Sequence, residues 1–330
     1  VNILQGGALE VLATLAPQVF QAVITSPPYW GLRDYGTTPQ AWPATKYVPM
    51  PGLPPIEIEA WEGELGCEPT PEAYIAHIVD IFRGVHRVLR DDGTLWLNIG
   101  DSYASSWAVN RRSQISNGSM EDGSRPFRPN RAVSGIKEKD LCGIPWRMAF
   151  ALQADGWFLR QEIIWAKPNP MPESATDRCT KSHEQLFLLS KKHKNYVFDC
   201  AAIEEPAVSA GRIAWNNSGE ALGVYGRSRE GLKARKEVGE KRRKRSVWYC
   251  PVSVLKEAHF ATFPPALVEP CILAGTRLGD AVLDPFGGSG TVGLVAQTHG
   301  RDSTLIELNP EYAAIADRRL ASIQPKLQFA

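Results

Sequence analysis

The stretch AVLDPFGGSGTVGLVAQ, residues 281 to 297, constrains the fold more than any other part of the chain. A short apolar strand pattern ends at Asp284, a glycine-rich turn follows, and an apolar helix begins. The turn consists of Pro285, Phe286, Gly287, Gly288, Ser289 and Gly290. Glycines allow backbone amides to approach a ligand closely, as in dinucleotide-binding turns. The pattern therefore predicts an α/β fold with a mostly parallel sheet.

A second acidic residue, Glu307, ends the next strand pattern 23 residues after Asp284. Nucleotide-binding βαβ units place an acid at an offset of about 20, where it accepts hydrogen bonds from ribose hydroxyls. The turn lacks the G-K-[ST] ending of a phosphate-cradling loop, which argues against a nucleoside triphosphate. We therefore expect a nucleoside-containing ligand without a triphosphate at this turn.

The turn TSPPYW, residues 25 to 30, follows another apolar strand pattern. Residues 1 to 25 read as strand, helix and strand, so this turn also lies at the carboxyl end of a strand, where ligands bind in open α/β sheets. It contains Ser26, Pro27, Pro28 and Tyr29. Two adjacent prolines restrict the backbone and hold a hydroxyl and an aromatic ring in place.

The remaining chain alternates between helix and strand patterns, with weaker segments between them. Residues 37 to 56 are rich in proline and are predicted to form a loop, and residues 102 to 138 a long mobile loop. Thr70 and Pro71 predict the start of a helix. The pattern weakens again at residues 192 to 254. We therefore divide the chain into residues 1–191 and 255–330, two halves of one core, and residues 192–254, an inserted segment.

Charge is concentrated in the inserted segment. Residues 226 to 245 hold ten Lys and Arg against three Glu, a local charge of +7, so the remaining chain carries −6 of the net +1. Such a block is either a solvated face or a site for a polyanion. Arg242, Arg243, Lys244 and Arg245 form its densest run.

Composition excludes several other classes of protein. The chain has no apolar run of 18 residues and no secretory layout at its amino terminus, so we expect a cytoplasmic protein without a membrane partner. Its six cysteines are scattered, without the spacing of zinc ligands, which predicts reduced thiols and no metal site.

Together, TSPPYW and DPFGGSGT resemble the amino-methylating DNA methyltransferases, which use S-adenosylmethionine. The resemblance extends over most of the chain and includes WAKPNPMPES, HEQLFLLSK, HFATFP and IELNPEY. Because the catalytic turn precedes the cofactor turn, with a basic segment between them, the order resembles the permuted β group. It implies a Rossmann-like S-adenosylmethionine-dependent methyltransferase fold with circularly permuted motif order and an inserted target-recognition region.

The resemblance also implies a role for each motif. The target base would flip out of the duplex, Tyr29 would stack on it, and the Ser26 hydroxyl and Pro27 carbonyl would accept hydrogen bonds from its exocyclic amine. Asp284, the glycine-rich turn and Glu307 would bind the cofactor, together with Phe260 and Thr262 of HFATFP. The basic run would contact phosphates of double-stranded DNA. One departure is Gly7 in QGGAL, where relatives often carry an acid.

Several alternatives remain open at this stage. A leading Ser in the catalytic turn favours cytosine N4, and adenine N6 is the second choice. A non-catalytic DNA-binding relative and a methyltransferase of protein or RNA amines are further alternatives. The Pro270–Cys271 dipeptide matches the nucleophile of cytosine-C5 enzymes, but it lies inside an apolar helix pattern, where a core thiol is expected. The sequence leaves open a homodimer and a cognate restriction endonuclease in the same restriction-modification system.

Overall fold

The structure, a computed structural model, describes residues 1–32, 37–104, 135–207, 240–252 and 263–322, and the backbone alone of residues 213–214, 236–237, 253–254 and 261–262. The predicted loop at 102 to 138 lies mostly outside these ranges. Within them, no helix is long and apolar enough to cross a membrane.

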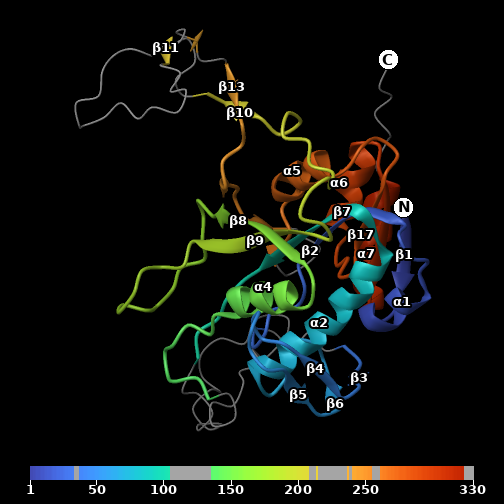
Figure 1. Ribbon diagram of the computed structural model, residues 1–330, viewed down its shortest axis with the longest axis vertical. Coiled ribbons are helices and arrows are strands. Elements are labelled where there is room, and N and C mark those ends of the chain that lie inside the picture. The colour runs from blue at the N-terminus through green and yellow to red at the C-terminus, as the bar shows by residue number, and fades with distance from the viewer. Residues whose placement is uncertain are drawn as a thin grey trace. The chain divides into compact units, whose positions relative to one another are not determined.

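One large sheet organises the core (Figure 1). Within the described residues it has eight strands in the order β1-β18-β17-β2-β7-β9-β8-β14. All neighbouring pairs are parallel except the two made by β9, which is antiparallel to both β7 and β8. The strands are β1 (Asn2–Gln5), β2 (Phe20–Thr25), β7 (Leu89–Ile99), β8 (Phe158–Ala166), β9 (His183–Ser190), β14 (Val247–Tyr249), β17 (Ala281–Asp284) and β18 (Asp302–Glu307). The predicted mostly parallel α/β fold is confirmed.

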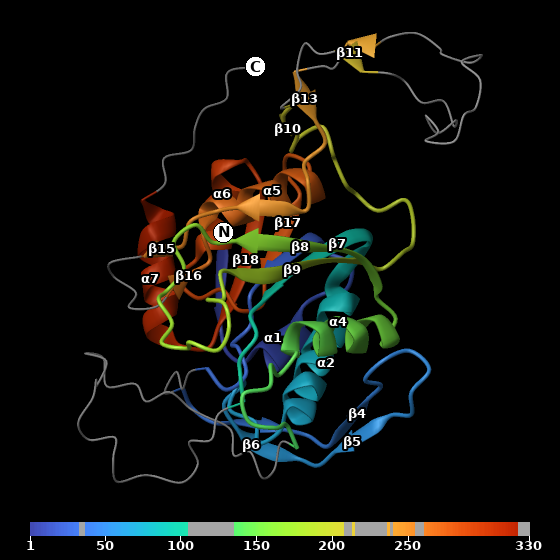
Figure 2. The same cartoon turned by 90° about the vertical axis from the view of Figure 1, so that its left-hand side faces the viewer.

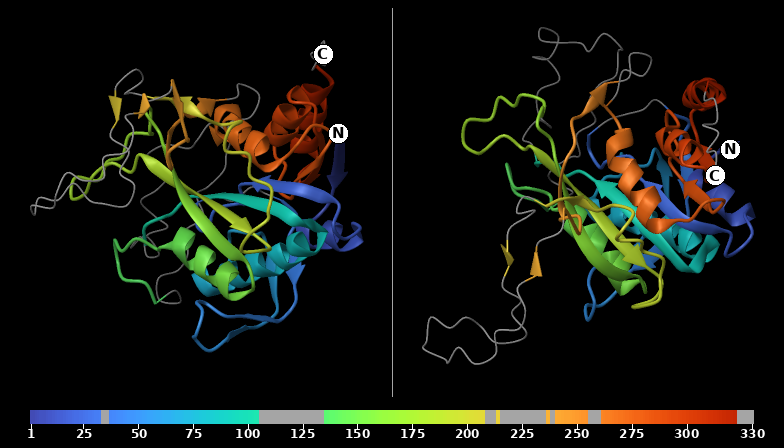
Figure 3. Two further views of the ribbon diagram at one scale, coloured as in Figure 1. Left: turned by 45° about the horizontal axis from the view of Figure 1, so that its top comes forward. Right: turned by 90° about the horizontal axis from the view of Figure 1, so that it is seen from above.

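Helices cover both faces of this sheet, as Figures 1, 2 and 3 show. One face carries α1 (Ala8–Thr14), α2 (Pro71–Val88) and α4 (Ile144–Ala154), and the other carries α5 (Pro265–Gly275), α6 (Thr291–Thr298) and α7 (Pro310–Ala321). The change of face follows from the direction in which the chain crosses the sheet. From β2 the next strand added to the sheet is β7, its neighbour on one side, whereas from β17 it is β18, its neighbour on the opposite side. Right-handed crossovers in opposite directions place their helices on opposite faces.

Helix α2 shows how the sequence determines an element. The Thr70 side chain accepts a hydrogen bond from the Ala73 amide (3.1 Å), and Pro71 occupies the first turn, where no amide partner is needed. A stripe at steps of four and three then faces the core, and each member is fully buried: Tyr74, Ile78, Ile81, Val85 and Val88. The predicted helix is therefore confirmed at its start and on its buried face.

The prediction of a loop at residues 37 to 56 is wrong in part. Two short antiparallel pairs lie in and beside this region. They are β3 (Gln40–Trp42) with β6 (Trp61–Gly63), and β4 (Thr45–Tyr47) with β5 (Ile56–Ile58). Trp42 and Tyr47 from these strands are buried in the core. Strands of three residues separated by prolines leave no periodic pattern long enough to detect in the sequence.

The chain divides into two compact units, residues 1–198 with 246–330, and residues 199–245. In the second unit, β10 (Glu205–Pro206) pairs with β13 (Lys241–Arg242), and β11 (Ile213–Ala214) pairs with β12 (Lys236–Glu237). Residues 246 to 254 belong to the first unit, because β14 adds to the main sheet beside β8. The assignment of residues 192–254 to target recognition stays a prediction.

Candidate active site

The candidate site lies where β17 and β2 are neighbours and their chain connections diverge. Their carboxyl ends lie side by side, at the topological switch point where open α/β sheets bind ligands. The glycine-rich turn follows β17 and TSPPYW follows β2, so the sheet brings together two motifs that lie at opposite ends of the sequence.

A buried hydrogen bond joins the two motifs directly. The Thr25 hydroxyl donates to Asp284 Oδ1 (2.6 Å), and the Phe286 amide donates to the same oxygen (3.0 Å). Asp284 is only 3% exposed, and burial raises the pKa of its carboxyl to about 7, although both hydrogen bonds act to lower it. The negative charge of Glu307 raises the pKa of Asp284 further. Asp284 is therefore the group that holds the turn against β2.

Glu307 fixes the other side of the glycine-rich turn. Its Oε2 accepts a hydrogen bond from the Gly288 amide (2.7 Å), and its Oε1 accepts one from the Asn309 amide (2.8 Å). Burial raises the pKa of this carboxyl, while these backbone donors lower it. Each carboxylate oxygen has a further lone pair, so Glu307 can also accept a hydrogen bond from a ligand hydroxyl.

The glycines of the turn serve the packing of the core as well as access to a ligand. A Cβ at Gly287 would lie 2.8 Å from the Cβ of Leu305 in β18. Gly290 has φ +83°, and a Cβ there would lie 2.9 Å from the Cβ of Ala316 in α7. We expected Gly287 to be needed where the backbone approaches the ligand, but the clash that a side chain would cause is with β18.

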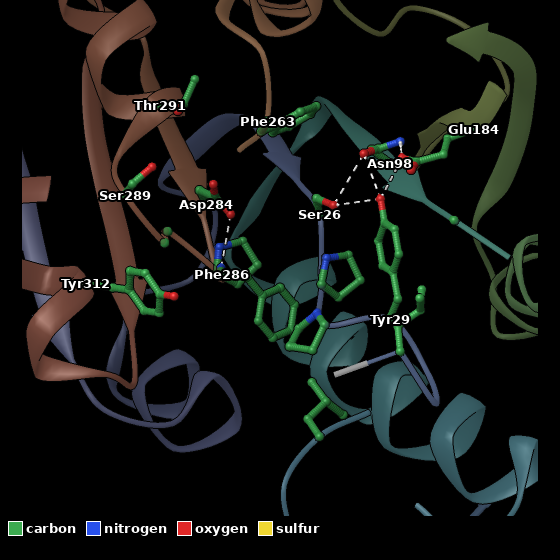
Figure 4. Close-up of a pocket in the computed structure, with 18 of the residues that line it drawn as sticks. Ser26, Tyr29, Asn98, Glu184, Phe263, Asp284, Phe286, Ser289, Thr291 and Tyr312 are labelled. Carbon is green, nitrogen blue, oxygen red and sulfur yellow. Dashed lines mark hydrogen bonds between the residues drawn. The ribbon is translucent and has the colours of Figure 1, made fainter. Parts of the chain in front are cut away.

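The TSPPYW turn carries a polar cluster, shown in Figure 4. Ser26 Oγ lies 3.2 Å from Tyr29 Oη and 3.3 Å from Asn98 Oδ1. Tyr29 Oη lies 3.0 Å from Asn98 Oδ1 and 2.8 Å from Glu184 Oε2. Asn98 comes from the end of β7 and Glu184 from the start of β9, where the antiparallel strand returns to the same edge of the sheet.

Hydrogen bonds to its backbone groups also fix the TSPPYW turn. Tyr74 of α2 donates a hydrogen bond to the Pro28 carbonyl (2.7 Å), and the Gly31 amide donates to the Gly66 carbonyl (2.9 Å). A Cβ at Gly100 would lie 2.5 Å from Cε2 of the Tyr29 ring, so the absence of a side chain at Gly100 is what makes room for that ring. The turn is thus fixed on both sides before any ligand binds.

A cavity of about 550 Å³ connects the two motifs. Its lining includes all of the predicted catalytic residues and most of the predicted cofactor residues: Ser26, Pro27, Pro28, Tyr29, Asp284, Pro285, Phe286, Gly287, Gly288, Ser289 and Glu307. Gly290 is not in this lining and lies against α7. Phe260 lies outside the described residues, and Thr262 is described only by its backbone, which pairs in β16 (Ala261–Thr262) with β15 (Ser253–Val254).

Sequence reasoning missed several residues of this cavity. Asn98, Glu184, Phe263 and Tyr312 all line it (Figure 4). A signal was present for Asn98, a polar residue in the apolar run LWLNI. The signal for Glu184 and Tyr312 was their presence in the quoted motifs HEQLFLLSK and IELNPEY.

The basic run belongs to the second unit, and the chain leads from it into β14. Arg242 Nε and Arg245 Nε both donate to Glu205 Oε1, at 2.9 and 2.6 Å. Part of the charge that we expected to contact DNA is therefore offset within the unit itself. Arg243 is exposed.

The Cys271 thiol has a structural environment. It is fully buried in α5, and its Sγ lies 3.3 Å from the Leu267 carbonyl one turn earlier. It is also absent from the lining of the cavity. This placement matches a core thiol and gives no support to a cytosine-C5 nucleophile.

Comparison with known proteins identifies the family. Residues 20–318 match the model of an N6/N4 DNA methylase family, described as DNA methylase. The chain belongs to this family. The type II methyltransferase M.SmaI of Serratia marcescens is 42% identical over 319 residues, covering 97% of this chain and 90% of that protein. The type II methyltransferase M.XycI of Xanthomonas campestris pv. cyanopsidis is 43% identical over 319 residues, covering 97% of this chain and 87% of that protein.

Solved structures of DNA methyltransferases have the same fold. The PvuII DNA methyltransferase, described as cytosine-N4-specific, aligns with a TM-score of 0.59 at 18% identity, covering 98% of this chain and 87% of that one. A DNA modification methylase of Thermus thermophilus, solved in complex with S-adenosyl-L-methionine, aligns with a TM-score of 0.53 at 20% identity, covering 99% of each chain. At this identity the likeness concerns the fold.

Family membership establishes the class of reaction. The chain is a DNA methyltransferase that takes its methyl group from S-adenosylmethionine, as the sequence predicted. The cavity fits such a cofactor, because it combines an apolar ring at Phe286, a glycine-rich turn, the buried carboxyl of Asp284 and the partly buried carboxyl of Glu307 at the switch point.

Proposed function

We propose that this protein methylates the exocyclic N4 of cytosine in a short site of duplex DNA, after flipping the base out of the helix. The observation that carries the proposal is the position of the Ser26 hydroxyl. It lies in a cavity that also contains the cofactor turn, and hydrogen bonds to Tyr29 and Asn98 hold it there. An acceptor at that point can accept a hydrogen bond from the amine of a base placed in the cavity.

The roles of the residues follow from this arrangement. Glu307, Asp284 and the glycine-rich turn would hold S-adenosylmethionine, with the Phe286 ring beside it. When bound, the cofactor supplies the methyl group. Ser26 and the Pro27 carbonyl would accept hydrogen bonds from the amine, which keeps the nitrogen lone pair directed at the donor. Tyr29 would stack on the base. Correct placement of two reactants can lower a barrier by roughly 7–11 kcal/mol.

The choice of cytosine over adenine rests on the size and charge of the group at position 26. A hydroxyl is neutral and shorter than a carboxylate or carboxamide, and so favours a pocket in which the smaller pyrimidine reaches both Ser26 and the Tyr29 ring. We extend the proposal to residues 192–254 as the target-recognition region, in which residues 242–245 contact phosphates and arginines read guanine edges. A cognate restriction endonuclease and a homodimer are compatible with this function.

The test is to incubate the enzyme and S-adenosylmethionine with unmethylated genomic DNA, digest the DNA to nucleosides and separate them by mass. We expect N4-methylcytosine, and we expect the Ser26→Ala variant to produce much less of it while still binding S-adenosylmethionine in calorimetry. N6-methyladenine without N4-methylcytosine would overturn the base assignment and leave the methyltransferase site standing.

A further inference from the structure

Glu184 has a special position in the polar cluster, because it contacts two other members, Tyr29 and Asn98, and also Lys167 beside the cluster. Its Oε2 lies 2.8 Å from Tyr29 Oη and 3.3 Å from Asn98 Nδ2, and its Oε1 is paired with the Lys167 ammonium. Both Glu184 and Lys167 are largely buried and line the cavity. The residue is therefore held in place on both of its oxygens.

These contacts determine how the Asn98 side chain is oriented. Its Nδ2 faces Glu184 Oε2 and the Gln185 carbonyl (3.1 Å), and both of these groups are acceptors. The opposite orientation of the amide would place its oxygen against two acceptors and lose both hydrogen bonds. Asn98 Oδ1 must therefore face Ser26 and Tyr29, as it does in Figure 4.

The single hydroxyl hydrogen of Tyr29 has three acceptors within reach, which are Glu184 Oε2 (2.8 Å), Asn98 Oδ1 (3.0 Å) and Ser26 Oγ (3.2 Å). The carboxylate of Glu184 is the closest, and a hydrogen bond to a charged group is about twice as strong as one to a neutral group. The hydrogen of Tyr29 therefore points toward Glu184, and its oxygen presents a lone pair to Ser26.

The hydrogen of Ser26 then faces two acceptors, Tyr29 Oη and Asn98 Oδ1. A hydroxyl that donates its one hydrogen inside the cluster has its lone pairs left to accept from a ligand. We propose that Glu184 is a positioning residue that sets the direction of every hydrogen bond in this cluster, so that Ser26 acts as an acceptor toward the target amine. The inference rests on the proposed role of Ser26 and holds for the amine of either base.

The decisive variants are Glu184→Gln and Glu184→Asp. Gln has the size of Glu but brings an NH₂ donor, which can face Tyr29 or Asn98 and reverse the direction of the cluster. Asp is too short for ideal contacts but remains an acceptor only. We expect the single-turnover rate at saturating cofactor and DNA to fall roughly ten- to a hundredfold in Glu184→Gln, the range for one charge-assisted hydrogen bond. Glu184→Asp should retain more activity than Glu184→Gln.

Three controls separate positioning from a loss of structure. Glu162→Gln makes the same change on β8, at a residue outside the lining of the cavity. Cofactor affinity measured by calorimetry should be unchanged in Glu184→Gln, and the variant should remain folded at the assay temperature, although loss of the ion pair with Lys167 should lower its thermal unfolding midpoint. In the Ser26→Ala background, Glu184→Gln should cost less than about threefold, because coupled residues give non-additive effects.

The outcomes are distinct for the inference and for the proposed function. Glu184→Gln being as active as wild type, or more active than Glu184→Asp, would overturn the inference even if N4-methylcytosine is formed. An equal loss of rate in the wild-type and Ser26→Ala backgrounds, or a loss of cofactor affinity in Glu184→Gln, would overturn it as well. N6-methyladenine as the product would overturn the base assignment alone.

Discussion

The buried carboxyl of Asp284 should make the stability of the protein depend on pH in a direction opposite to that of a salt-bridged acid. Its pKa is about 7 in the folded chain, against an ordinary value of 3.8. Between these values the folded protein holds a proton that the unfolded chain has released. Stability is therefore highest below pH 4 for this group, and it falls as pH rises through 7. Each pH unit costs about 1.36 kcal/mol of stability, and the loss stops near pH 7, where the folded protein also releases the proton. The free energy of unfolding therefore falls by about 3 kcal/mol between pH 5 and pH 8.

The assay is denaturant unfolding of wild type and Asp284→Asn at pH 5 to 8 without cofactor. Asn retains an oxygen that can accept from Thr25 and Phe286 but does not titrate. As pH rises, the wild type should lose about 3 kcal/mol of unfolding free energy relative to Asp284→Asn. The other titrating groups are the same in both proteins, so their contributions largely cancel in the difference. Asp317→Asn, at an exposed position in α7, provides the baseline. A difference that stays constant over this range would refute a raised pKa for Asp284.

Three further expectations concern the glycine turn, the helix cap and the basic run. Gly287→Val should lower the thermal midpoint and S-adenosylmethionine affinity together, because its Cβ would meet Leu305; affinity lost at full stability would contradict this cause. Thr70→Ala should cost about 1 kcal/mol in denaturant unfolding, since the Ala73 amide loses its acceptor, whereas no loss would mean that water replaces the cap. Neutralising residues 242–245 together should lower the slope of log affinity against log salt by about 0.9 per lost phosphate contact, with cofactor affinity unchanged. An unchanged slope would identify a solvated face.

The local elements of the site were predictable because each leaves its mark within a short window of sequence. The strand ending at Asp284, the glycine turn and the helix after it were all read from the single stretch 281 to 297. The same holds for the helix that Thr70 begins. The buried bond from Thr25 to Asp284 joins residues 259 positions apart, and the sequence indicated only that both ends lie at one edge of the sheet.

The parts that escaped prediction depend on the order of strands in the sheet. Glu184 begins a strand pattern whose direction cannot be read from its residues, and only an antiparallel placement beside β7 brings it to Asn98 and Tyr29. The pairing of Arg242 and Arg245 with Glu205 likewise spans 37 and 40 positions. A charge count over one window treats these arginines as available to a polyanion, although a carboxylate from outside the window already faces them.

The antiparallel strand β9 also explains how one edge of the sheet can present both backbone groups from turns and side chains from a strand. Parallel strands bring only their carboxyl ends to this edge, and each is followed by a turn whose backbone groups can bind a ligand, as after β17 and β2. An antiparallel strand brings its amino end there instead, so Glu184 reaches the site from a regular strand rather than from a loop. A side chain on a strand is held by the ladder on both sides and is placed more accurately than one on a loop. The turn after β17 therefore offers backbone groups to the cavity, whereas the turn after β2 is held by two strand residues, Asn98 and Glu184, whose hydrogen bonds have a fixed direction. This division requires no particular order of the two motifs along the chain, because the Thr25–Asp284 contact joins them across the sheet.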